Sequence, residues 1–158
     1  METALQSCLF LLMLNNLLML GSTRIMWLIR FTAFQGILLA GMLLTMEHAL
    51  LAAAVLLIKG ALLPGLLWRT RNRLHSHHRM RPRMHVAVGV LAGMGGLVLS
   101  LWLEARLLTL PALFPPLLLP TALTTLFCGL ILVVGRTTAL AQVIGYLVAE
   151  NGIFLLGM

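Results

Sequence analysis

Charged residues are scarce in this sequence. Only 9% of its 158 residues are charged, all four acidic residues are glutamates, and 61% are hydrophobic. Soluble domains contain about 25% charged and about 45 to 50% apolar residues, because water must solvate their surfaces. The composition therefore excludes a soluble globular domain, and the mean hydropathy of +1.04 indicates an integral membrane protein.

The sequence also lacks the motifs of redox, nucleotide-binding and hydrolytic sites. It contains no Cys-x-x-Cys pair, no glycine-rich phosphate loop, and no Ser/His/Asp set placed on one water-facing surface. Its two cysteines, Cys8 and Cys128, lie within apolar segments, where we expect free thiols that act as small hydrophobic groups. We expect no metal, cofactor or redox catalysis in this chain, so any such chemistry would belong to partner subunits.

Six apolar runs are candidates to cross a bilayer, which takes about 20 residues as a helix. They predict an all-α, polytopic membrane helix bundle that forms a single transmembrane domain over residues 1–158. We interpret the first run as a retained helix rather than a signal peptide, because Glu2 but no Arg or Lys precedes it and no small-residue cleavage site follows. Asn15 and Asn16 near its end are expected to be satisfied by the membrane interface or by a neighbouring helix. The predicted helices span residues 3–20, 25–45, 49–68, 86–103, 117–135 and 138–158.

Basic residues predict the direction of these helices. The formal net charge of +7 comes mainly from arginines in the segment 69–85, which the positive-inside rule identifies as a cytoplasmic loop more simply than as a nucleic-acid surface. Alternate crossings then place the turns at Arg24 and Arg136 on the same side, so the N-terminus is predicted to lie outside. The predicted topology and docking residues are Arg69, Arg71, Arg73, Arg79, Arg81, Arg83 and Arg136.

Four histidines, His75, His77, His78 and His85, lie among these arginines. A metal site is one interpretation of the His-x-His-His spacing. No Cys or carboxylate accompanies the histidines, so solvated side chains that touch anionic lipid or an acidic partner subunit are preferred.

Lys59 lies about eleven residues into the third apolar run. A lysine at that depth costs about 2.5 to 3.5 kcal/mol on insertion scales. One interpretation is snorkelling of the ammonium to an interface, which is a strained reach from mid-helix. The other is a buried cation that pairs with a carboxylate or faces a wet cavity. Pro64, five residues later, predicts a local break in the helix because it removes a backbone hydrogen bond.

The last apolar run, residues 136–158, carries a single carboxylate near its middle, Glu150. Apolar surroundings disfavour the charged form of a carboxylate and a nearby cation favours it, so a carboxylate under both influences can load and release a proton. Lys59 is the cation that the apolar runs offer as its partner. The alternative is that Glu150 is a protonated, hydrogen-bonded packing residue. The possible polar neighbours are Asn151, Gln35 and Gln142.

A family resemblance rests on the same residues. The run from Arg136 through Gly145 to Glu150, Asn151 and Gly152, taken with Lys59-Gly60 and Pro64, resembles hydrogenase-4 component E. That family supplies membrane subunits of energy-converting group 4 hydrogenase and formate hydrogenlyase-type complexes. Its C-terminal part is similar to the K-type subunit of complex I and the C-type subunit of multisubunit cation/proton antiporters.

The resemblance implies a role for Glu150. In the wider set of families, an arginine-bearing cytoplasmic turn leads into a helix whose central glutamate belongs to the proton-conducting axis. The family continues into further helices after that glutamate, whereas this sequence stops eight residues past Glu150. We therefore expect the rest of any proton route in other helices. The implied partners are antiporter-like subunits, an H-type membrane anchor and lipid, in a bacterial or archaeal cytoplasmic (inner) membrane.

The predicted function is a membrane subunit of a complex I-like, redox-driven ion-translocating complex, in which Glu150 and Lys59 contribute to a proton pathway. This chain would then be a non-catalytic subunit of an oxidoreductase complex. The alternatives are a structural or assembly subunit with no direct proton transfer, and a stand-alone small-ion carrier.

Overall fold

The structure is a computed structural model that describes residues 2–73, 85–107, 115 and 117–158. Its elements are α1 (Glu2–Gly21), α2 (Ile25–Thr45), α3 (Ala49–Val55), the π-helical η1 (Leu56–Leu62), α4 (Leu63–Arg73), α5 (Val86–Leu107), α6 (Leu118–Gly135) and α7 (Ala139–Leu156). α3, η1 and α4 are consecutive in sequence and form one span. The described residues therefore contain six spans long and apolar enough to cross a membrane. The predicted all-α architecture with six apolar helices is confirmed.

Two helices extend four or five residues further than predicted. The third span continues through Arg73, which places Arg69 and Arg71 on a helix instead of in a loop. The fourth continues to Leu107 and includes Arg106 in its last turn. Arginine and glutamate are good helix formers and no proline or glycine intervenes, so both helices continue beyond their apolar parts. The predicted loop residues Arg79, Arg81 and Arg83, with His75, His77 and His78, lie outside the described residues.

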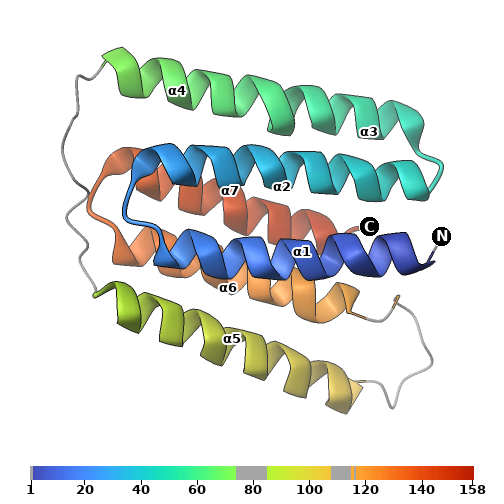
Figure 1. The fold of residues 1–158 in the computed structure, drawn as a ribbon. Coiled ribbons are helices and arrows are strands. Elements are labelled where there is room, and N and C mark those ends of the chain that lie inside the picture. The colour runs from blue at the N-terminus through green and yellow to red at the C-terminus, as the bar shows by residue number, and fades with distance from the viewer. Residues whose placement is uncertain (1, 74–84, 108–114, 116) are drawn as a thin grey trace.

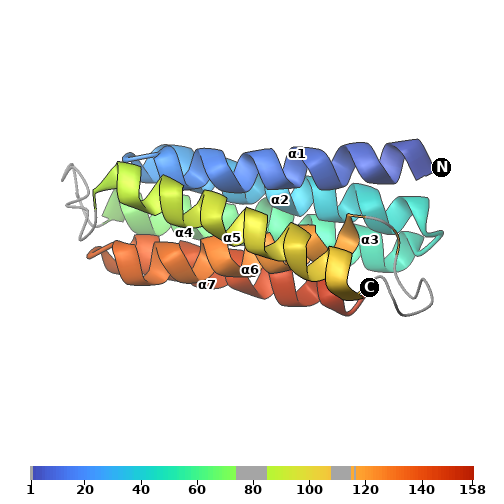
Figure 2. The same cartoon turned by 90° about the horizontal axis from the view of Figure 1, so that it is seen from below.

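The helices lie side by side (Figure 1), and Figure 2 shows the bundle from the side that α5 covers, with α1 along one edge and α7 along the other. α6 and α7 form the most extensive contact, α5 packs on α6, and the third span packs on α2. The α1–α2 turn, the α6–α7 turn and the end of α4 lie at one end of the bundle, and both termini lie at the other end (Figure 1). We call the first of these the basic end, because it carries Arg24, Arg136, Arg69, Arg71 and Arg73.

Three glycines allow the backbones of α6 and α7 to touch. A Cβ atom added at Gly129, Gly145 or Gly152 would lie between 2.3 and 2.8 Å from a backbone nitrogen of the facing helix. No side chain fits at that separation, so only glycine permits the contact, as small residues do at membrane helix interfaces. The contact fixes the rotation of α7 about its axis. Asn151 is consequently buried in the bundle, and the neighbouring Glu150 is half-exposed.

The buried core has a polar layer between two apolar clusters. One cluster lies toward the basic end and includes Leu28 and Leu132. The other lies toward the termini and includes Leu39 and Leu155. Along each of α1, α2, α6 and α7, a buried polar residue separates the members of the two clusters. These polar residues are Asn16, Gln35, Thr125 and Asn151.

Candidate functional site

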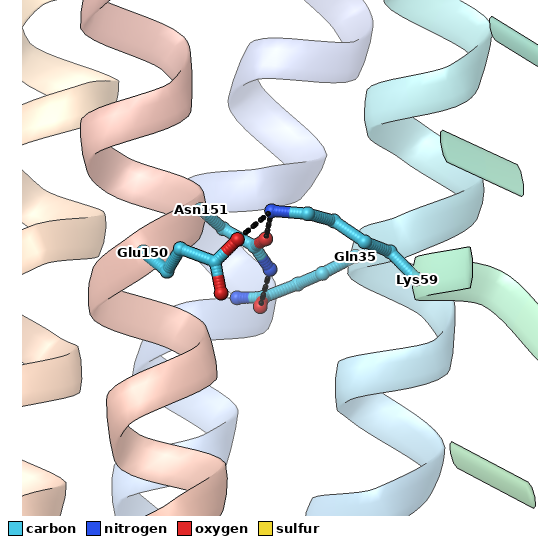
Figure 3. Close-up of polar contacts among 4 residues, drawn as sticks. All are labelled: Gln35, Lys59, Glu150 and Asn151. Atoms are coloured by element: carbon cyan, nitrogen blue, oxygen red, sulfur yellow. Dashed lines mark hydrogen bonds and ion pairs between the residues drawn. The ribbon is translucent and has the colours of Figure 1, made fainter. Parts of the chain in front are cut away.

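Lys59 and Glu150 meet in the structure (Figure 3). The Lys59 Nζ lies 3.0 Å from Glu150 Oε1 and donates a hydrogen bond of 2.7 Å to Asn151 Oδ1. The same ammonium lies 5.0 Å from the centroid of the Phe154 ring, within range of a cation–π interaction. All three partners belong to α7 and lie within two turns of it. One side chain of η1 is therefore held by a carboxylate, an amide and an aromatic face of α7.

The ion pair lies midway along its two spans. Lys59 is ten residues beyond the start of its span at Ala49, and Glu150 is eleven residues beyond the start of α7 at Ala139. At 1.5 Å per residue these separations are about 15 and 16.5 Å, in a hydrocarbon layer about 30 Å thick. Both charges are thus placed where an unpaired charge is most costly.

A π-helical turn presents Lys59. The backbone N–H of Leu63 bonds to the carbonyl of Ile58, five residues back, in place of the α-helical four. Pro64 follows directly, and it has no N–H to donate to the carbonyl of Gly60, which its ring would crowd in an α-helix. The wider turn relieves that crowding, and π-turns are frequent at functional sites. The local break predicted from Pro64 is thus present, as a π-turn with Lys59 at its centre.

Helix α2 packs directly against the backbone at Lys59. A Cβ atom on Gly36 would lie 2.6 Å from the carbonyl carbon of Lys59 and 2.7 Å from the nitrogen of Gly60. The backbones of α2 and η1 are therefore in direct contact at the lysine. From this anchored position the Lys59 side chain reaches α7 (Figure 3).

The ion pair continues into the bundle as a chain of hydrogen bonds. Asn151 Nδ2 donates to Gln35 Oε1 at 3.1 Å, and Gln35 Nε2 donates to Asn16 Oδ1. Asn16 Nδ2 donates to Thr125 Oγ1 at 2.7 Å, and this hydroxyl donates to the carbonyl of Thr121 at 2.6 Å. The chain joins η1, α7, α2, α1 and α6, so it links five of the six spans.

The ammonium of Lys59 sets the donor-to-acceptor direction of this chain of hydrogen bonds. Lys59 can only donate, so Asn151 must turn its oxygen to Lys59 and its NH₂ to Gln35, and each following amide takes the same direction. Side-chain amides do not titrate at physiological pH. The amides therefore hold the site in position, and Glu150 and Lys59 are the members that can gain or lose a proton.

Glu150 lies on the outer face of the bundle. Its side chain is 46% exposed, against 13% for Lys59. Its neighbours along the same face of α7, Val143, Tyr146 and Ile153, are also exposed. The carboxylate is thus reachable from outside the chain, and the ammonium lies between it and the buried amides.

Two of the three predicted polar neighbours join the site. Asn151 contacts Lys59 directly, and Gln35 is connected through Asn151. Gln142 does not take part, because its Nε2 donates to the backbone carbonyl of Arg136 at the basic end, 3.1 Å away.

Arg136 ties two turns of the basic end together. Its Nη2 donates to the carbonyls of Leu20 at 3.2 Å and Ser22 at 2.6 Å, and the residue is only 5% exposed. Burial lowers the pKa of this guanidinium, because its charged form loses hydration. Thr138 takes the N-cap position of α7, but its hydroxyl makes no capping hydrogen bond. Arg136 is therefore a structural tie between the α1–α2 and α6–α7 turns.

Sequence reasoning did not assign Gly36, Asn16 or Thr125 to the site. The side chain of Asn16 forms hydrogen bonds with two neighbouring helices. This confirms the expectation that a neighbouring helix, and not the membrane interface, supplies its partners. The available signal was a polar residue in the middle of an apolar run, which Asn16 and Gln35 share with Glu150. Among the described residues, no group of three or more His, Cys, Asp or Glu side chains is placed to hold a metal ion.

No protein-family model, curated protein or solved structure matches the sequence. The fold and the site define the described part of the chain as all-helical, with six apolar spans and an ion pair midway along two of them. The resemblance to hydrogenase-4 component E stays a prediction.

Proposed function

We propose that this chain is a membrane subunit of a larger, redox-driven ion-translocating complex, and that Glu150 and Lys59 are the titratable elements of a proton pathway within it. The observation that carries the proposal is the half-exposed carboxylate of an ion pair at mid-membrane depth. This combination is costly in a protein that faces only lipid, and intramembrane charges commonly mark ion pathways.

The exposure of Glu150 argues for a partner subunit. Hydrocarbon cannot hydrogen-bond to the carboxylate oxygen that Lys59 leaves free, and a partner helix with a polar group at this depth can. Covering the face that carries Tyr146 and Ile153 would also remove exposed apolar surface from lipid contact. A neighbouring subunit would thus complete the site that this chain begins.

We assign different roles to the two charges on the basis of their exposure. Glu150 is the group that a proton can reach from the partner side, since it is the more exposed of the pair. Lys59 stabilises the carboxylate between transfers, and its ammonium keeps Asn151 and Phe154 as partners when Glu150 is protonated. Protonation of Glu150 would therefore loosen one contact of Lys59 without leaving the ammonium unpartnered.

The basic end is proposed to face the cytoplasm of a bacterial or archaeal cell. Arg24, Arg136 and the described arginines of α4 lie together there, as the positive-inside rule requires of cytoplasmic turns. Both ends of the described chain then lie on the outer side of the membrane.

A structural role is the second candidate, and one observation favours it. η1 packs most closely on α2 and on its neighbours in sequence, and the Lys59 side chain attaches it to α7. In that case the ion pair would lock the third span to the bundle and no proton would move.

The test is Glu150→Gln in the protein purified together with its membrane partners in mild detergent. Glutamine keeps the shape of the side chain and removes its titration. We expect the complex to assemble and redox-coupled proton uptake into vesicles to be lost. Glu47→Gln is the matched control, since Glu47 lies in the α2–α3 connection outside the helical spans, and it should leave uptake unchanged.

The two candidates separate in the charge-swapped variant Lys59→Glu, Glu150→Lys. A structural ion pair works in either direction, so the swap should restore assembly that each single substitution weakens. A proton pathway needs the carboxylate on the exposed side, so uptake should stay lost. Unchanged uptake in Glu150→Gln, with assembly intact, would refute the transport role.

A further inference from the structure

A groove on the outer surface of α1 and α2 is separate from the ion-pair site. Its walls are the exposed leucines Leu11, Leu14 and Leu18 of α1 and the aromatic rings of Phe31 and Phe34 of α2. The leucines are three and four residues apart, so they form one continuous apolar stripe along the helix. The groove encloses about 560 Å³ of empty space, counting the part at its open mouth.

One end of the groove is positively charged and aromatic. Arg30 and Trp27 line it there, with the Arg30 guanidinium 5.3 Å from the centroid of the Trp27 ring. Arg30 is five residues from the start of α2 at Ile25, which places it about 7.5 Å along the helix from the basic end. Because the spans are about as long as the hydrocarbon layer is thick, the backbone of Arg30 lies just inside the boundary with the headgroups, and a long arginine side chain can reach the phosphates from there.

No carboxylate that the structure describes neutralises this charge. Glu47 and Glu104 belong to the opposite end of the bundle, and Glu150 is paired with Lys59. Arg71 brings a second cation to this end of α2, where its Nη1 contacts the sulfur of Met26.

We propose that this groove is a binding site for an anionic phospholipid, with the phosphate on Arg30 and one acyl chain along the leucine stripe. A cation that reaches the headgroups and is joined to a long apolar groove matches the order of groups in a lipid molecule. A partner helix would have to supply a negative charge at the boundary and an apolar ridge below it, whereas a single anionic lipid supplies both. Basic residues near the membrane surface attract anionic lipid with about 1 kcal/mol each.

The test uses Trp27 as the reporter in the purified full-length chain. Trp68→Phe and Trp102→Phe leave Trp27 as the single tryptophan, and the protein is reconstituted into phosphatidylcholine vesicles. Phosphatidylglycerol or phosphatidylcholine brominated in the upper acyl chain is then added at equal mole fraction, and quenching of Trp27 is compared. We expect the brominated anionic lipid to occupy the site about fivefold more effectively, which corresponds to one basic contact.

The chain contains a matched control at the other end of the bundle. Arg106 lies 5.3 Å from the centroid of the Trp102 ring, the same distance as between Arg30 and Trp27, and Glu104 lies two residues before it. With Trp102 as the single tryptophan, the two brominated lipids should quench about equally.

Substitution of Arg30 decides between the possible outcomes. Arg30 is exposed, so Arg30→Gln should leave the bundle folded and remove the preference of Trp27 for the anionic lipid, while Arg30→Lys should retain most of it. Equal quenching of Trp27 by both lipids in the unsubstituted groove would overturn the proposal. So would a preference that survives Arg30→Gln, or a Trp27 shielded from both lipids, which would indicate that a second copy of the chain covers the groove.

Discussion

The contact between Gly36 and the backbone of Lys59 makes a quantitative prediction. A methyl group at position 36 would lie 2.6 Å from the carbonyl carbon of Lys59 and 2.7 Å from its oxygen, whereas ordinary contact begins at 3.4 Å. Gly36→Ala therefore requires α2 and η1 to separate by about 0.8 Å, and backbone atoms cannot rotate away as the end of a side chain can. Overpacking of this kind typically costs about 1 to 3 kcal/mol.

The assay is reversible unfolding in mixed micelles of mild detergent and dodecyl sulfate, followed by helical circular dichroism. The matched control is Gly41→Ala on the same helix, because a Cβ at Gly41 has nothing within 4 Å. We expect Gly41→Ala to raise the free energy of unfolding by about 0.4 to 1 kcal/mol, because alanine suits a helix interior better than glycine, and Gly36→Ala to lower it.

The same substitution tests how the site is positioned. The methyl group of Gly36→Ala meets the backbone of Lys59 itself, so the displacement moves the lysine relative to Glu150 without changing any charge. We expect proton uptake by the assembled complex to fall in Gly36→Ala and to remain unchanged in Gly41→Ala. If the two variants were equally stable and equally active, the close packing of α2 on η1 would be refuted as the support of the ion pair.

Three further predictions concern the amide chain, the basic end and the topology. Asn16→Ala leaves Gln35 Nε2 without its acceptor and should lower the free energy of unfolding by about 1 to 3 kcal/mol. The double variant with Gln35→Ala should lower it by less than the sum of the two single changes. Additive losses would contradict a connected chain of hydrogen bonds. Arg136→Met removes the charged donor from the carbonyls of Leu20 and Ser22 and should cost about 1.5 to 3 kcal/mol, whereas Arg24→Met, at an exposed position of the same end, should be nearly neutral in the same unfolding assay. The topology can be tested in a protein with Cys8 and Cys128 replaced by alanine. A membrane-impermeant maleimide added to intact cells should label His48→Cys and spare Thr23→Cys, two exposed positions at opposite ends of the bundle. The reverse pattern would contradict a cytoplasmic basic end.

The arrangement of buried polar groups shows where sequence reasoning reached its limit. Lys59 and Glu150 stood out because each is a charge within an apolar run, and their cost in hydrocarbon can be calculated from the residue type alone. Gly36 did not stand out, because its role depends on which helix α2 faces. Asn16 and Thr125 are ordinary polar residues in sequence, and they become part of the site only because α1 and α6 bring them to the depth of Gln35.

Helix ends were predicted less well than helix centres. The prediction for the third span ended at Trp68 and that for the fourth at Leu103, where the apolar residues give way to charged ones, but the helices continue to Arg73 and Leu107. Hydropathy marks the part of a helix that hydrocarbon surrounds, and backbone hydrogen bonds continue wherever the residues favour helix and no proline or glycine stops it.

Composition and the apolar runs by themselves predicted an all-helical membrane protein of six spans. They also marked a glutamate and a lysine near the middle of two spans, where a charge is costly to bury. These are properties of single segments, because the cost of an unpaired charge in hydrocarbon follows from the residue type and its depth. The meeting of Lys59 and Glu150 was decided only by the tertiary structure. It depends on the glycine contacts between α6 and α7 and at Gly36, and on a π-turn that presents the lysine, because the distance between two side chains on separate helices is set by how closely and at what rotation those helices pack.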